Sequence, residues 1–119
     1  MVVPSAEIIF LDELSTRRDL SPQASVRVLG RLREYSPTSQ RALVALHQCE
    51  LEVDTSLLQG VALQEGCLLQ VIGELSGAPP HCVLHARVAR NVDGLDVELY
   101  RQAVQLRRQF LARVAAPPS

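Results

Sequence analysis

The stretch that decides the fold runs from Cys67 to Val114 and reads CLLQVIGELSGAPPHCVLHARVARNVDGLDVELYRQAVQLRRQFLARV. It predicts two strands, Cys67–Leu75 and Cys82–Arg90, because apolar and polar side chains alternate in the second. Asp93-Gly94 then turns the chain, and Asp96 is placed to cap a helix or to sit in its first turn. This helix begins near Leu95 and is the last regular element.

The helix carries more apolar surface than one core requires. At about 100° per residue, its apolar side chains form two neighbouring stripes over roughly 200° of arc, where a helix on a single core needs about 100°. The first stripe is Leu95, Leu99, Ala103, Leu106, Phe110 and Val114; the second is Val97, Tyr100, Val104 and Leu111. We therefore expect one stripe to pack on the helix's own domain and the other on a partner protein.

The rest of the helix is polar. Arg107 alone interrupts the apolar face, while the opposite side holds Glu98, Arg101, Gln102, Gln105, Arg108 and Gln109. Because the pattern does not say which stripe faces the partner, the predicted contacts come from both. They are Leu99, Tyr100, Ala103, Val104, Arg107, Phe110, Leu111 and Val114.

Upstream of Cys67 the sequence predicts three more strands, at Val26–Arg33, Arg41–His47 and Glu50–Asp54. Alternation indicates that the first and third are buried on one face, whereas the almost wholly apolar second is typical of a strand covered on both. Residues 56–66 form a connector, with a possible helical turn at Leu57-Leu58. Five short strands and a closing helix favour a mainly β protein, a five-stranded OB-fold barrel with a C-terminal helix. An SH3-like barrel and a split α+β sheet are the alternatives.

The chain of 119 residues has the size of one domain. Its predicted parts are an N-terminal extension that packs on the barrel (1–24), the barrel (25–92), the partner-binding helix (93–114) and a tail (115–119). No stretch has the apolar length of a membrane helix, and the N-terminus lacks the pattern of a signal peptide. Three cysteines, an odd number, suit a reducing compartment. We expect a soluble intracellular protein.

The formal charge of −1 does not indicate a nucleic-acid-binding protein, although all twelve basic residues are arginine. Five of these arginines lie on the outward positions of the first and fifth predicted strands. They are candidate phosphate contacts: Arg27, Arg31, Arg33, Arg87 and Arg90. An ordinary solvated face is the equally weighted alternative.

Other polar groups give weaker indications of chemistry. His81 and His85 share a strand face, but Cys82 points to the other side, so a metal site is not expected. Glu50, Glu52 and Asp54 are typical of a solvated acidic face. Neither Cys82 nor His85 lies in a recognisable catalytic motif. We predict a protein without catalytic activity, metal or cofactor.

Across Val26 to Phe110 the chain resembles the smallest OB-fold subunit of the CST telomere complex, the TEN-one family, whose near relative is the smallest subunit of replication protein A. The order and spacing of several short segments carry the resemblance, and no single one is diagnostic. They are Val28-Leu29-Gly30-Arg31-Leu32, Leu69-Gln70-Val71-Ile72-Gly73-Glu74-Leu75, His85-Ala86-Arg87-Val88, Val92-Asp93-Gly94-Leu95 and Leu99-Tyr100-Arg101-Gln102-Ala103-Val104.

The resemblance implies a nuclear, telomeric, non-enzymatic subunit whose C-terminal helix packs against a larger OB-fold subunit of the Stn-one type. With a third large subunit, such a complex would bind single-stranded telomeric DNA and help polymerase α–primase fill in the complementary strand. By position, Phe110 matches an aromatic residue of the family's partner-facing helix. The alternatives are the smallest subunit of replication protein A and a stand-alone single-strand-binding protein.

Overall fold

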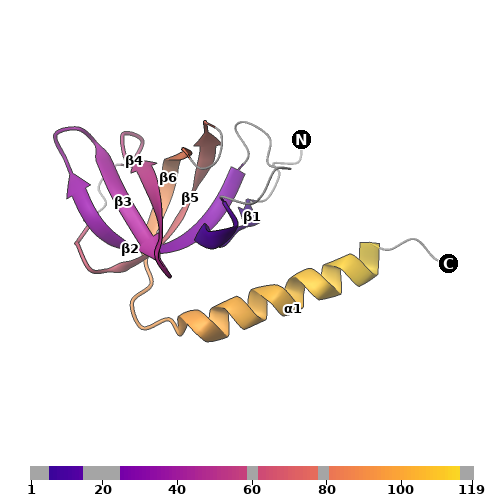
Figure 1. The fold of residues 1–119 in the computed structure, drawn as a ribbon. Coiled ribbons are helices and arrows are strands. Elements are labelled where there is room, and N and C mark those ends of the chain that lie inside the picture. The colour runs from indigo at the N-terminus through magenta and orange to yellow at the C-terminus, as the bar shows by residue number, and fades with distance from the viewer. Residues whose placement is uncertain (1–5, 15–24, 59–61, 78–80, 116–119) are drawn as a thin grey trace.

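The computed structural model describes residues 6–14, 25–58, 62–77 and 81–115. In these residues the chain forms a β-barrel with one long helix running across its lower end (Figure 1). The elements are β1 (Glu7–Ile8), the 3₁₀ turn η1 (Leu11–Glu13), β2 (Ser25–Ser36), β3 (Arg41–Leu46), β4 (Cys49–Asp54), β5 (Leu68–Ser76), β6 (Val83–Asn91) and α1 (Val97–Ala115).

The five longer strands close into a barrel. Their order is β2-β3-β4-β6-β5, and β5 pairs again with β2 to complete the circle. All neighbours are antiparallel except β4 and β6, which pair in parallel at Val53 and Leu84. This arrangement confirms the predicted OB-fold with its C-terminal helix. The sixth strand, β1, was not predicted; its two residues pair in parallel with Val26 and Arg27 of β2.

The interior of the barrel follows the alternation in the sequence. Val26, Val28 and Leu32 of β2 are at most 1% exposed, and Leu51 and Val53 of β4 are also buried. The prediction for Arg41–His47 is wrong in two respects. Only Ala42 and Val44 of β3 are fully buried, and the strand ends at Leu46 because His47 has a positive φ of 51° in the following turn.

Two strand irregularities curve the sheet. The register of β2 with β3 shifts between Leu32 and Glu34, and that of β5 with β6 shifts between Ile72 and Gly73. At the second shift the backbones approach so closely that a Cβ on Gly73 would lie 2.1 Å from the carbonyl oxygen of His85. The bend that closes the barrel here therefore requires glycine.

Hydrogen bonds to aspartate carboxylates fix the passage from barrel to helix. The backbone N–H of Leu68 donates to Asp93 Oδ1 at 2.7 Å, and this bond lowers the pKa of Asp93. The N–H of Leu99 donates to Asp96 Oδ1 at 3.0 Å, which confirms the predicted N-cap, although α1 begins at Val97 rather than near Leu95. Around Leu57 and Leu58 the chain makes a hydrogen-bonded turn instead of a helical turn.

Among the described residues, no helix has the length and apolar character that a membrane crossing requires.

We predict that Gly73→Ala destabilises the barrel by about 3 kcal/mol or more, because the new methyl group meets backbone atoms that cannot move aside. Urea unfolding measures the change. Glu74→Ala on the same strand is the control, since it removes only a surface ion pair with Arg87, worth at most about 1 kcal/mol. Equal stability of the two variants would contradict the assigned role of Gly73.

Candidate partner-binding surface on helix α1

The N-terminal segment 6–14 forms the seat on which α1 lies. Ile9, Leu11 and Leu14 insert into the barrel core, and each is at most 6% exposed. The N–H of Ile9 donates to the carbonyl oxygen of Arg27 at 3.0 Å, which continues the pairing of β1 with β2. The helix therefore meets a segment that is itself anchored in the barrel.

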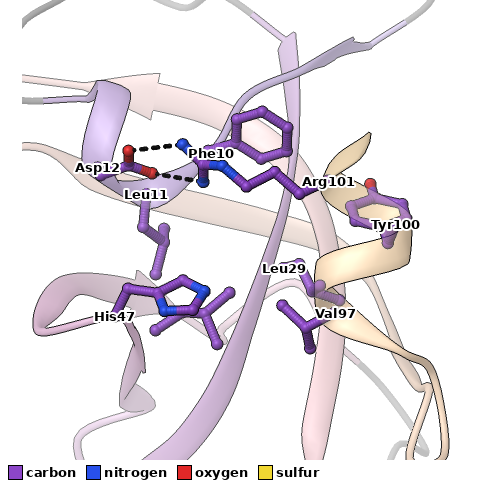
Figure 2. Close-up of a pocket in the computed structure, with 9 residues that line it drawn as sticks. Phe10, Leu11, Asp12, Leu29, His47, Val97, Tyr100 and Arg101 are labelled. Atoms are coloured by element: carbon purple, nitrogen blue, oxygen red, sulfur yellow. Dashed lines mark hydrogen bonds and ion pairs between the residues drawn. The ribbon is translucent and has the colours of Figure 1, made fainter. Parts of the chain in front are cut away.

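Two arginines of α1 clamp this segment around one aromatic ring. The guanidinium carbons of Arg101 and Arg108 lie 4.2 and 4.8 Å from the centroid of the Phe10 ring. Both distances are within the range of cation–π attraction. Figure 2 shows the Arg101 half of the clamp, with Phe10 beside the long side chain and Asp12 at its end.

Carboxylates of η1 complete the clamp. Arg101 donates two hydrogen bonds to the carboxylate of Asp12, at 3.0 and 2.8 Å. Arg108 donates two to the carboxylate of Glu13, both at 2.9 Å, and a third to the carbonyl oxygen of Ile8 at 2.6 Å. The N–H of Phe10 also donates to Glu13. Such bidentate pairs fix orientation as well as contributing energy.

The Asp12–Arg101 pair changes the pKa values of both groups. The hydrogen bonds from Arg101 lower the pKa of Asp12, and the same bonds raise the pKa of Arg101. Each partner thus favours the charged form of the other at neutral pH.

Apolar side chains fill the space between the two arginines and the barrel. Val104 is only 6% exposed, and Val97 and Tyr100 are half-buried. Val97, Tyr100 and Phe10 line a small cavity with Leu29 of β2 (Figure 2). The hydroxyl of Tyr100 is buried and has no hydrogen-bond partner among the described residues.

The opposite side of α1 is a band of exposed apolar side chains. Leu99, Leu106, Phe110 and Val114 are 62–67% exposed, and Leu95 and Ala103 of the same stripe are exposed as well. The spacing of three or four residues places the five from Leu99 to Val114 on one face of α1, and Leu95 lies just before the helix begins at Val97. A contiguous apolar patch of this kind marks an interaction site on a soluble protein. We call these six residues the open stripe.

This arrangement shows which predicted contact residues are accessible. Leu99, Ala103, Arg107, Phe110, Leu111 and Val114 are exposed in the isolated chain, and Tyr100 is half-buried. Val104 is only 6% exposed, because its side chain packs against the chain itself. Arg101 and Arg108, which were predicted to lie on the solvent side of the helix, instead hold the helix to its own domain.

The five arginines predicted as phosphate contacts are spread over the barrel, and most of them already bind other groups of the chain. Strand register places Arg27 and Arg31 of β2 on the same outer face of the sheet as Arg90 of β6, but β5 lies between these two strands. Arg90 donates to Gln70, and Arg31 donates to the carbonyl oxygen of Gly66.

Carboxylates lie beside three of these arginines. The ion pairs are Arg31 with Asp93, Arg33 with Glu50, and Arg87 with Glu74. Arg27 has no such pair among the described residues; it is half-buried, and its Nε atom has no hydrogen-bond partner there. The described arginines therefore do not form an uncompensated basic patch.

Cys82 and His85, the residues considered above for metal binding or nucleophilic chemistry, make contacts that support the fold. Cys82 lies in the barrel core, where burial raises the pKa of its thiol. His85 hydrogen-bonds Ser76 through Nε2 at 2.7 Å and Asp54 through Nδ1 at 3.1 Å. These bonds link β5, β6 and β4 side by side, so the chain of three groups stabilises barrel closure.

Comparison with known proteins finds a matching family and several similar proteins. The family described as "Telomere-capping, CST complex subunit" matches residues 2–114. A curated relative, the CST complex subunit TEN1 of Arabidopsis thaliana, is 38% identical over an 89-residue alignment that covers 73% of this chain and 70% of the relative.

Solved structures show the same fold at lower identity. The telomere-capping protein Ten1 of Saccharomyces pombe has a TM-score of 0.75 at 20% identity, covering 88% of this chain and 99% of that one. A chain in the structure of the S. pombe Stn1–Ten1 complex gives 0.73 at 21% identity, with 89% and 94% covered. A chain of Ustilago maydis replication protein A bound to single-stranded DNA gives 0.64 at 15% identity, with 94% and 96% covered.

The clamp predicts an acid-sensitive stability. Because Arg101 lowers the pKa of Asp12 in the folded chain, the pair stabilises the fold fully above the ordinary aspartate pKa of about 3.9. This contribution is lost as the pH falls through the lowered pKa. In urea unfolding at pH 7 and at about pH 2.5, Asp12→Asn is expected to lose less free energy of unfolding on acidification than the wild type.

Glu34→Gln, at an exposed carboxylate of β2, is the matched control and should keep the wild-type pH dependence. If Asp12→Asn also kept it, the Asp12–Arg101 pair would have no part in holding the helix.

Proposed function

Because this chain belongs to the family of telomere-capping subunits of the CST complex, we propose that it is a small adaptor subunit that acts by heterodimerisation. Its partner is a larger OB-fold subunit of the Stn1 type. The S. pombe Stn1–Ten1 structure, which contains a chain of the same fold, supports this choice of partner.

The observation that carries the proposal is the open stripe. Its side chains lie on the far side of α1 from the clamp, so the helix offers them without giving up its own packing. Burying one leucine or phenylalanine side chain stabilises by about 1.5–3 kcal/mol. Four such side chains supply enough energy for a stable complex after the costs of association are met.

The assembled complex then binds DNA. We propose that the heterodimer joins a third large subunit, binds single-stranded telomeric DNA in the nucleus and supports fill-in synthesis by polymerase α–primase. The compensated arginines of the barrel favour a supporting role for this chain, with much of the phosphate contact supplied by the larger subunits. The Arabidopsis relative and the family match favour this assembly over replication protein A, for which the likeness is one of fold.

A stand-alone single-strand-binding protein is the second candidate. Half-buried Arg27, which lacks an ion pair among the described residues, is the observation that favours it, since a partner phosphate would satisfy the group.

We predict that Phe110→Ala weakens binding to the larger OB-fold subunit about 10- to 100-fold, because the variant loses the burial of one aromatic ring. Leu111→Glu is expected to abolish co-purification. Isothermal titration calorimetry measures the affinity, and circular dichroism checks that the barrel stays folded. Gln109→Ala, beside Phe110 on the polar side, should bind as the wild type does; wild-type binding by Phe110→Ala would remove α1 from its proposed role.

For DNA we expect the isolated chain to bind single strands no more tightly than the non-specific range of about 10⁻⁴–10⁻⁶ M, with a shallow salt dependence. Fluorescence anisotropy with a labelled oligonucleotide across a salt series measures both quantities. Submicromolar affinity with a steep salt slope, lost in Arg27→Gln, would instead establish the stand-alone function.

A further inference from the structure

We propose that the groove between β1 and α1 is a second docking site for the larger OB-fold subunit. It receives a segment that carries an apolar side chain next to a carboxylate. This inference rests on the proposed function and extends the contact surface around the helix, beyond the open stripe.

The groove has apolar walls from two distant parts of the chain. Ala6 and Ile8 line it on the β1 side, while Val104 and Leu111 line it on the helix side, and the space between them is about 340 Å³. That volume fits one large apolar side chain with a length of extended backbone. Val104, which the open stripe cannot use, forms part of this wall.

Arg108 holds the two walls in place before any partner arrives. From the helix it donates to the carbonyl oxygen of Ile8 at 2.6 Å and to the carboxylate of Glu13 at 2.9 Å. A groove whose walls are already tied together costs less conformational entropy on binding than one that must form.

The charge at the rim of the groove specifies the occupant. Arg107 is exposed and makes no ion pair or hydrogen bond with any described residue, whereas Arg108 beside it is paired with Glu13. A free guanidinium next to apolar side chains recognises a carboxylate, with which it forms two parallel hydrogen bonds.

The groove is continuous with the open stripe. At about 100° per residue, Arg107 and Leu111 lie on α1 between the stripe and the buried side that holds Val104. A partner seated on Phe110 and Val114 therefore reaches the groove by passing over Arg107 and Leu111, which are both exposed. This continuity favours the larger subunit over a second copy of this chain as the occupant.

The test compares two variants with the same change in net charge. Arg107→Gln removes the rim cation, and Gln109→Glu adds a charge on the polar side of the helix. Titration of the full chain with the larger OB-fold subunit at several salt concentrations should show about 10-fold weaker binding and a shallower salt slope for Arg107→Gln. Gln109→Glu should stay within twofold of the wild type, and Ala6→Trp, which fills the groove, should also weaken binding.

The outcomes separate this inference from the function on which it rests. Wild-type affinity of both Arg107→Gln and Ala6→Trp, with binding lost in Phe110→Ala, would overturn the groove and leave the adaptor function intact. Wild-type binding by Phe110→Ala would overturn the function itself. Dimers of the isolated chain that Arg107→Gln abolishes would identify a second copy as the occupant, and would also overturn the inference.

Discussion

The position of the helix depends on one aromatic ring held between two arginines. Phe10 lies in a segment anchored to β2, and Arg101 and Arg108 enclose it while their ends bind Asp12 and Glu13. The hydrogen bonds that Arg101 and Arg108 donate from α1 end on Ile8, Asp12 and Glu13, so residues 6–14 transmit the support of the barrel to the helix. The N-terminal segment, predicted to pack on the barrel, is therefore also part of the interface between barrel and helix.

This arrangement divides the surface of α1 by chemistry. Charged side chains with aliphatic stems hold the helix to its own domain, and the apolar residues that a single-core helix would bury stay available on the other side. The barrel meanwhile pairs four of its described arginines with carboxylates. The described surface thus favours the proposed adaptor function over stand-alone binding of a nucleic acid.

The sequence predicted the barrel well because period-two alternation reports directly which side of a strand is buried. Val26, Val28, Leu51 and Val53 all point inward as their pattern indicates. The contact between α1 and residues 6–14 was not predictable in this way. β1 has two residues and no period, and Arg101 and Arg108 have the appearance of solvated residues. Their spacing of seven, with Val97 and Val104 also seven apart, was the available signal, but it identifies a buried stripe only once the carboxylates of η1 are known to face it.

A purely apolar seat would have left the rotation of α1 poorly defined. With leucines in place of Arg101 and Arg108, apolar residues would cover most of the helix circumference, and several rotations would bury similar areas. The two guanidinium groups find carboxylates and a carbonyl oxygen in one orientation only, and every other rotation leaves those charges without their partners. The pairs therefore contribute specificity more than stability: they select the rotation that leaves Leu99, Leu106 and Phe110 facing away from the barrel.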